Sequence, residues 1–168
     1  MIYGGTCWGG FRKCYTFNNA GIGVGGPLHE STEEDWDRVV DINLKGTWLC
    51  MKYQIRQMLK QGSGAIVNNS SGAGLTGYSC SPLYSASKHG VIGLSKSAVL
   101  QYITKGIRIN VVCPGVIMTP MIENAYKSGP GVKKWFESIQ PTGQAGEPEE
   151  AAHAVLWLCP YANSFCSL

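Results

Sequence analysis

Two short apolar segments with a helical segment between them restrict the fold of this chain most strongly. GAIVNNSS (residues 64–71) is bounded by glycines and IRINVVCPG (residues 107–115) ends in Pro-Gly, so each indicates a buried β-strand. Between them, Ser81 and Pro82 suit the start of a helix, which Gly106 ends after about six turns. A strand, a helix and a second strand in this order predict two parallel strands of one sheet.

Helical patterns also lie on either side of these strands. Residues 31–62 have a helical period, with Ser31 or Thr32 as the N-cap and acidic residues in the first turn. Residues 147–159 show a further helical pattern that Pro148 opens. The alternation of helices and strands predicts an α/β fold, in which helices cover both faces of a parallel sheet.

Composition excludes several classes of protein. Hydrophobic residues make up 44% of the 168 residues and charged residues 15%, which suits one compact domain better than a disordered chain. The net charge is +3 and no run of Lys or Arg exceeds two residues, so we expect no nucleic-acid or membrane partner. No apolar stretch approaches the roughly 20 residues of a membrane-spanning helix, and no signal peptide is apparent. The seven cysteines form no Cys-x-x-Cys pair and the three histidines have no metal-ligand spacing, which favours reduced thiols, a cytoplasmic location and no metal site.

Tyr84 and Lys88 lie four residues apart in the first two turns of the predicted helix, so they share one face. A phenol has an ordinary pKa near 10, and a cation at about 4 Å could lower that pKa by up to about three units. Such a phenol could act as an acid or base at neutral pH. Alternatively, the two side chains are only neighbours on a solvated helix face.

Two further polar residues have positions that suit a site. Ser71 ends the first predicted strand, and ligands bind at the carboxyl ends of parallel strands. Asn43 lies inside a predicted helix between Ile42 and Leu44, so its amide is expected to be buried and to need partners. It is either a satisfied core amide or the anchor of a water chain that reaches Lys88.

Five motifs, in this order and spacing, resemble the short-chain dehydrogenase/reductase family. They are NNAG at residues 18–21, Asn43, the strand end at Ser71, YSASK at residues 84–88, and the Pro-Gly pair at residues 114–115. The resemblance extends from about Asn18 to Phe165 and implies part of a Rossmann-like, doubly wound parallel sheet. The expected reaction is hydride transfer between NAD or NADP and a small-molecule alcohol or ketone.

The resemblance implies a role for each matching residue. Tyr84 would be the general acid/base, and Lys88 would lower its pKa and hold the nicotinamide ribose. Ser71 would orient the substrate carbonyl, and Asn43 would support a proton relay. The expected cofactor-binding residues are Asn18, Ala20, Gly21, Tyr84, Lys88, Pro114, Gly115, Ile117 and Thr119.

Residues 116–140 correspond to the variable lid of the family. Their larger apolar side chains favour an apolar substrate, or else they only pack the helices of the lid. These side chains are Met118, Met121, Ile122, Trp135 and Phe136.

The phosphate-binding part of the family pattern is not found in this sequence. GIGVGG (residues 21–26) fits G-x-G-x-x-G as a string, but Pro27 follows it and no helix opens at its last glycine. Residues 1–17 are therefore expected to form an atypical N-terminal segment, with a weak strand just before Asn18. Residues 18–168 are expected to form the catalytic part of the domain, without the dinucleotide-binding half and the last strand.

Two functions from different classes remain open. The chain is an oxidoreductase, or it is an inactive family member that retains only an association surface. The small residues of the Tyr84 helix suit close helix packing and hence a homo-oligomer under either interpretation. They are Ser85, Ala86, Ser87, Gly90, Gly93, Ser97 and Ala98.

Overall fold

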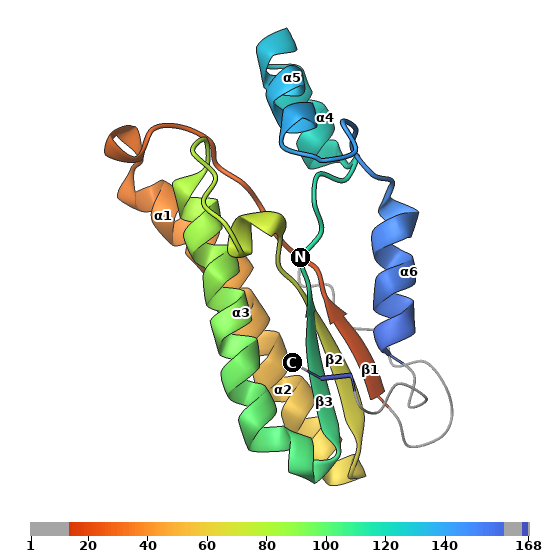
Figure 1. Cartoon of the computed structure of the whole chain (residues 1–168). Coiled ribbons are helices and arrows are strands. Elements are labelled where there is room, and N and C mark those ends of the chain that lie inside the picture. The colour runs from red at the N-terminus through yellow and green to blue at the C-terminus, as the bar shows by residue number, and fades with distance from the viewer. Residues whose placement is uncertain (1–13, 160–165, 168) are drawn as a thin grey trace.

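The computed structural model describes residues 14–159 and 166–167, which contain a three-stranded parallel sheet. Strand β1 (Cys14–Asn18) pairs with β2 (Gly64–Asn69), which pairs with β3 (Ile107–Val112) (Figure 1). Thr16 stands opposite Ile66, which stands opposite Ile109. The two predicted strands are confirmed, and each ends two or three residues earlier than expected. The weak strand expected before Asn18 is also present.

Helices cover both faces of this sheet, as the alternating sequence pattern predicts. Helices α2 (Gly46–Gln61) and α3 (Pro82–Tyr102) lie on one face, and α6 (Pro148–Leu158) lies on the other (Figure 1). Crossover connections of this kind make neighbouring strands parallel. The core between the sheet and the helices contains Cys14, Met51, Ile55, Met58, Ile66, Ala98, Val99, Ile107 and Ile109.

The sequence of residues 31–62 predicts one helix, but in the structure these residues form three consecutive helical segments. Helix α1 (Glu33–Val40) leads into a π-helical turn, η2 (Asp41–Lys45), which leads into α2. The π-helical turn accommodates one more residue than an α-helical turn, and such turns often occur at functional sites. Thr32 is the N-cap, because its Oγ1 accepts a hydrogen bond from Asp35 N–H at 3.1 Å. Ser31 instead donates from its hydroxyl to the carbonyl of Leu28.

Helix α3 has the predicted length, but its first residue is not capped as expected. Ser81 occupies the N-cap position, yet its hydroxyl donates a 2.7 Å hydrogen bond to Val24 O in the loop after β1. This bond ties the start of α3 to that loop. At the other end, Gly106 has a left-handed φ of 77° and leads directly into β3.

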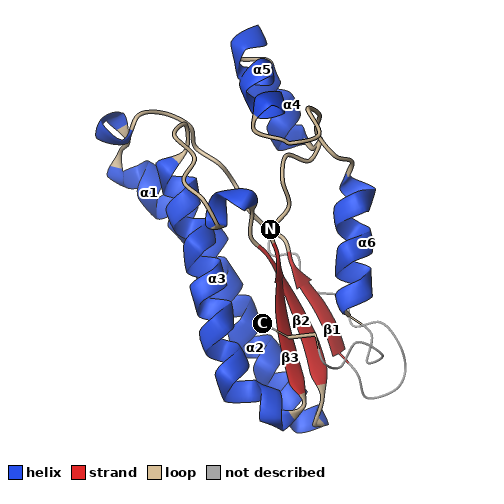
Figure 2. Ribbon diagram, viewed as in Figure 1, coloured by secondary structure: helices blue, strands red, loops and turns tan. Residues whose placement is uncertain are grey.

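The segment between β3 and α6 forms the lid, which we define as residues 118–145. It contains two short helices, α4 (Pro120–Tyr126) and α5 (Pro130–Ser138), that project beyond the carboxyl end of the sheet (Figure 2). Ile117 and Gly146 form a parallel bridge where the lid begins and ends. Single turns of 3₁₀-helix complete the fold: η1 (Leu28–Glu30), η3 (Gly72–Gly74) and η4 (Ile103–Lys105).

Candidate functional site

The site lies at the carboxyl end of β2, where the start of α3 meets the loop after β1. Lys88 is 3% exposed, and its Nζ donates a 2.9 Å hydrogen bond to the main-chain carbonyl of Asn69, the last residue of β2. The same Nζ lies 5.5 Å from the centroid of the Tyr84 ring. Lys88 is therefore not a solvated surface residue, and it links Tyr84 to the end of the strand.

Burial shifts the pKa values of both residues, because it disfavours the charged form of each. The pKa of Lys88 falls from 10.5 to about 8, and the nearby Cys113 thiol has a smaller opposite effect. The pKa of Tyr84 is raised above its ordinary 10.0, mainly by burial. The neighbouring Ser71 hydroxyl lowers this pKa, and the charge of Tyr78 raises it. We expected Lys88 to lower the pKa of Tyr84. The pKa is instead raised, because desolvation of the phenol dominates.

Ser71 lies two residues beyond β2, in the turn that opens η3. Its Oγ accepts a hydrogen bond from Ala73 N–H at 3.1 Å, and the same hydroxyl is close enough to the Tyr84 phenol to lower the pKa of that phenol. The next residue, Gly72, donates its N–H to Pro114 O at 2.8 Å. The turn after β2 is thus attached to the Pro-Gly pair after β3, so the ends of two neighbouring strands form one surface.

Asn43 is fully buried in the π-helical turn and connects three parts of the site. Its Oδ1 accepts from Ile22 N–H at 2.8 Å, while its Nδ2 donates to Ile22 O at 2.9 Å and to Ser87 Oγ at 3.0 Å. The Ser87 hydroxyl in turn donates to the carbonyl of Tyr84 at 2.7 Å. The amide is therefore satisfied by protein groups, and it holds the loop after β1 against α3. Its part in a water relay stays a prediction.

The predicted cofactor-binding residues fall into separate groups. Gly21 lies beside Lys88 and Asn43: a Cβ there would lie 3.4 Å from Lys88 Nζ and 3.5 Å from Asn43 Oδ1. Ala20 is exposed in the same loop. Asn18 directs its amide elsewhere, since it exchanges hydrogen bonds with Gln54 and donates to Asn68 Oδ1 at 2.7 Å.

A pocket of about 460 Å³ contains three more of the predicted residues, Pro114, Gly115 and Ile117. It lies between the end of β3, the end of the lid and α6. Thr119 is the N-cap of α4 and does not line this pocket, nor do Tyr84 and Lys88. A volume of this size is within the usual range for ligand pockets.

Sequence reasoning missed two residues of this site, Ser87 and Tyr78. Ser87 lies three residues after Tyr84 on the same helix. A small polar residue on a buried helix face could have indicated that Ser87 belongs to the site. Tyr78 lies in the loop after η3, and its position beside Tyr84 depends on how that loop folds. Nothing in the sequence around Tyr78 indicates this.

The fold and the site together define an α/β protein of the Rossmann-like class. The family model described as enoyl-(acyl carrier protein) reductase matches residues 14–167. The chain belongs to the short-chain dehydrogenase/reductase family. The part of that family's sheet that the described residues contain is three parallel strands with helices on both faces.

Similar proteins include two curated bacterial dehydrogenases. The 2,5-dichloro-2,5-cyclohexadiene-1,4-diol dehydrogenase of Sphingobium indicum is 43% identical over 89% of this chain and 60% of its own length. A cyclohexanol dehydrogenase from an Acinetobacter species is 45% identical over 89% of this chain and 57% of its own length. The solved structure "ElxO with NADP Bound" has a TM-score of 0.84 and 38% identity, covering 91% of this chain and 62% of that one. The chain thus spans about 60% of the length of the relatives it matches.

The described residues contain neither a candidate membrane span nor a candidate metal site. Within residues 14–159 and 166–167, no helix is both long enough and apolar enough to cross a lipid bilayer. Over the same ranges, no three His, Cys, Asp or Glu side chains are grouped so that they could hold a metal ion.

Proposed function

We propose that this protein is an oxidoreductase that transfers a hydride between NAD or NADP and an alcohol or ketone. The observation that carries this proposal is the arrangement of Ser71, Tyr84 and Lys88 at the carboxyl end of β2. The Ser71 hydroxyl is close enough to the half-buried Tyr84 phenol to lower its pKa, and the buried ammonium of Lys88 lies 5.5 Å from the centroid of the Tyr84 ring. The NADP-bound relative and the two dehydrogenases named above support the same reaction class.

The residues around this arrangement fit the nicotinamide end of such a cofactor. Gly21 has no side chain to cover Lys88 Nζ, since a Cβ there would lie 3.4 Å from it. Among the described residues, the buried Oδ1 of Asn69 has no hydrogen-bond partner, although the main-chain carbonyl of the same residue accepts from Lys88. These polar groups suit the hydroxyls of a ribose, and the Pro114–Ile117 pocket lies at the next strand end.

The proposed mechanism assigns the proton to Tyr84. When bound, the cofactor supplies the hydride or accepts it. In ketone reduction, Ser71 donates a hydrogen bond to the substrate oxygen and the Tyr84 phenol gives that oxygen its proton. In alcohol oxidation the alcohol proton passes to the Tyr84 phenolate. Because the pKa of Tyr84 is raised, the phenol is protonated at neutral pH, which favours ketone reduction there and alcohol oxidation at alkaline pH.

Asn43 and Lys88 hold this machinery in place. The Asn43 amide fixes Ile22 and Ser87, and Ser87 holds the main chain of Tyr84. We further propose that Asn43 supports a proton relay that leads from Tyr84 through Lys88 toward solvent. The main-chain carbonyl of Asn43 already accepts a 2.7 Å hydrogen bond from Thr47 Oγ1, so a water would have to share that oxygen.

For the substrate we propose a secondary alcohol on a six-membered carbon ring, or the matching ketone. Two of the relatives are named for such rings, cyclohexanol and a cyclohexadienediol. The lid supplies apolar side chains for it, and none of the residues of α4 or α5 is buried in the fold. An apolar ring would cover part of this exposed surface.

The test is turnover by the purified 168-residue chain. Cyclohexanone with NADH or NADPH at neutral pH, and cyclohexanol with the oxidised cofactors at alkaline pH, are followed by the absorbance of the reduced nicotinamide. We expect reduction at neutral pH to be the faster reaction. Absence of turnover with every cofactor and both substrates, at cofactor concentrations up to about 10 mM, would contradict the proposal.

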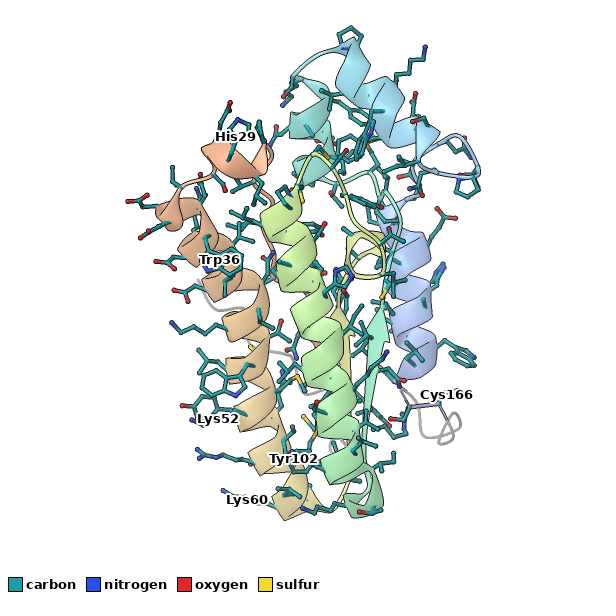
Figure 3. The ribbon with its side chains drawn as sticks, turned by 60° about the vertical axis from the view of Figure 1, so that its left-hand side comes forward. His29, Trp36, Lys52, Lys60, Tyr102 and Cys166 are labelled. Atoms are coloured by element: carbon teal, nitrogen blue, oxygen red, sulfur yellow. The ribbon has the colours of Figure 1, made fainter. Side chains whose placement is uncertain are left out.

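The second candidate function is that of an association module that forms homo-oligomers. A separate observation, the exposure of apolar side chains, favours it. Several apolar side chains on α2 and α3 face outward, including Leu100 at 83% and Tyr53 at 59% exposure. Figure 3 shows Trp36 and Lys52 on the outer surface of α1 and α2. Of the small residues expected to permit helix packing, Ala86, Gly93 and Ser97 are exposed, while Ser85, Ser87 and Ala98 pack inside the chain.

Sedimentation of the wild-type chain and of Leu100→Lys tests the association. If α3 forms the contact, wild type sediments as an oligomer and the variant as a smaller species. A monomeric wild-type chain would contradict both the module and the homo-oligomer.

We also propose a cytoplasmic location, because a reducing compartment suits the thiols. Five cysteines of the described residues are free thiols: Cys50, Cys80, Cys113, Cys159 and Cys166. Fractionation of cells that produce the protein tests this, and recovery in the membrane or extracellular fraction would contradict it.

A further inference from the structure

An aromatic contact connects the lid to the loop that follows the Ser71 turn. The rings of Tyr78 and Trp135 meet edge to face, with centroids 5.9 Å apart and an interplanar angle of 88°. Trp135 also contacts the ring of Phe136 at 4.9 Å, and Phe136 contacts Tyr126 at 6.1 Å. Edge-to-face geometry is favourable for aromatic rings. Tyr78 is therefore the residue through which the aromatic cluster of the lid contacts the loop that follows the Ser71 turn.

Tyr78 lies beside the catalytic hydroxyls. Its own hydroxyl is 3.0 Å from the position that a Cβ on Gly72, the residue after Ser71, would occupy. It is also near enough to Tyr84 for the charge of one phenol to affect the other. The Tyr78 main chain is fixed to the start of α3, because its N–H donates to Ser85 Oγ at 3.4 Å and its carbonyl accepts from Ser81 N–H at 3.2 Å.

Gly23 lies between Met121 of the lid and the Tyr84 ring. A Cβ on Gly23 would lie 3.7 Å from Met121 Sδ and 3.9 Å from Cδ2 of the Tyr84 ring. Gly23 thus lies next to the catalytic ring, and Met121 at the start of α4 lies next to Gly23. Gly23 therefore connects the start of the lid to the Tyr84 ring, and the charge of Tyr78 affects the Tyr84 phenol.

We propose that Tyr78 and Trp135 form the substrate-selecting wall of this site and that they favour a cyclic alcohol or ketone over a small open-chain one. This inference rests on the proposed function, because Ser71 and Tyr84 place the substrate oxygen. A substrate oxygen held there puts the attached carbon skeleton beside the Tyr78 ring. A six-membered ring reaches this wall, whereas the two methyl groups of propan-2-ol have too little surface to fill the same space. Trp135 acts as a positioning residue, since its edge-to-face contact holds the Tyr78 ring.

The test compares cyclohexanol with propan-2-ol in the full chain. We expect Tyr78→Ala and Trp135→Ala each to lower the ratio of the two kcat/KM values by roughly 10-fold or more, mainly through the KM for cyclohexanol. Tyr78→Phe keeps the ring and should keep the ratio. Because Trp135 acts through Tyr78, the double variant should lose no more than the Tyr78→Ala single variant. Trp48→Ala, which removes an exposed tryptophan from α2, is the matched control.

A binding measurement separates this inference from the proposed function. Saturation-transfer NMR reports binding of cyclohexanone and acetone without any turnover. Binding of cyclohexanone that is lost in Tyr78→Ala supports the wall even if no hydride transfer occurs. A wild-type chain that binds neither ketone, or variants that keep the wild-type preference in binding and turnover, would overturn the inference. If Trp135→Ala loses its circular dichroism signal, Trp135→Leu replaces it, because leucine keeps an apolar side chain in α5.

Discussion

The ammonium of Lys88 is held by the main-chain carbonyl of Asn69 across a 2.9 Å hydrogen bond, so a buried cation ties α3 to the end of β2. The bond compensates only part of the cost of burying the charge, because the pKa of Lys88 is lowered to about 8. This residue therefore connects the chemistry of the site with the stability of the fold.

The pH dependence of stability should reveal the buried Lys88. In the unfolded chain its pKa is 10.5, against about 8 in the folded chain, so between these values the unfolded chain binds more protons. The Lys88 contribution to the free energy of unfolding therefore rises with pH in this window, and its burial cost is fully present below about pH 8. Relative to Lys88→Met, the wild type should gain about 2 kcal/mol between about pH 7 and about pH 9.5. Urea denaturation of both proteins measures this difference, and subtracting the variant cancels the titration of cysteines and other tyrosines. A constant difference would show that Lys88 titrates normally.

Tyr84→Phe should abolish most of the proton transfer while leaving the fold intact. The variant loses only the phenolic oxygen, and loss of an acid/base group typically lowers the rate roughly 100- to 10,000-fold. Steady-state reduction of cyclohexanone measures the effect. Tyr53→Phe on the exposed surface of α2 is the control and should retain full activity. Unchanged turnover in Tyr84→Phe would remove Tyr84 from the mechanism.

Asn43→Ala should destabilise the fold by about 2–4 kcal/mol. The substitution leaves the half-buried main-chain groups of Ile22 and the buried hydroxyl of Ser87 without their Asn43 partner, and an unsatisfied buried polar group costs about 1–3 kcal/mol. Thermal or urea denaturation measures the loss. The exposed Asn124→Ala, which loses only a bond from Lys127, should stay within about 0.5 kcal/mol of the wild type. Equal stability of the two variants would mean that the amide network around Asn43 contributes nothing.

The 168-residue chain should bind NADH and NADPH weakly, with dissociation constants above roughly 0.1 mM. Pyrophosphate groups are usually held at a helix N-terminus behind a glycine-rich turn. The glycines at residues 21–26 precede α1, whose first turn carries Glu33, Glu34 and Asp35 and would repel phosphate. The nicotinamide end alone should then carry the binding, so reduced nicotinamide mononucleotide should bind about as tightly as NADH.

Calorimetric titration measures these affinities, and Lys88→Met serves as the variant in which the nicotinamide end is impaired. A 1:1 isotherm of micromolar affinity for either dinucleotide would refute the expectation of weak binding. A large advantage of NADH over the mononucleotide would place a phosphate or adenosine site within this chain.

Local sequence patterns predict the strands and helices well, because the periods and breakers act over a few residues. Pro82 and Gly106 bracket α3, and Glu147 forms a capping box with Glu150 at the start of α6. The π-helical turn around Asn43 was not predicted, since one additional residue in a turn barely changes an apolar period. Ser81 was expected to cap α3, but its hydroxyl binds Val24 O, which lies 57 residues earlier in the chain.

The candidate site was predictable where its residues lie in one motif and not where distant segments meet. Tyr84 and Lys88 share a helix face, and their spacing alone indicates this. The direction of the Tyr84 pKa shift depends on burial by other elements, so the sequence suggested the opposite direction. The contact between Tyr78 and Trp135 joins the lid to a loop far away in the chain, and no local pattern predicts such a contact.

The bridge between Ile117 and Gly146 has a consequence for how this protein family can diversify. Met118 N–H donates to Gly146 O at 2.8 Å, and Gly146 N–H donates to Val116 O at 2.9 Å, so the lid leaves the framework and rejoins it at one point. A segment with adjacent ends behaves as a cassette: it can be exchanged for one of another length, while β3 and α6 keep their places. Lengthening such a loop costs little, since each doubling adds only about 0.6 kcal/mol of closure entropy. We therefore expect that grafting residues 118–145 between relatives transfers substrate preference while Tyr84 and Lys88 remain where they are.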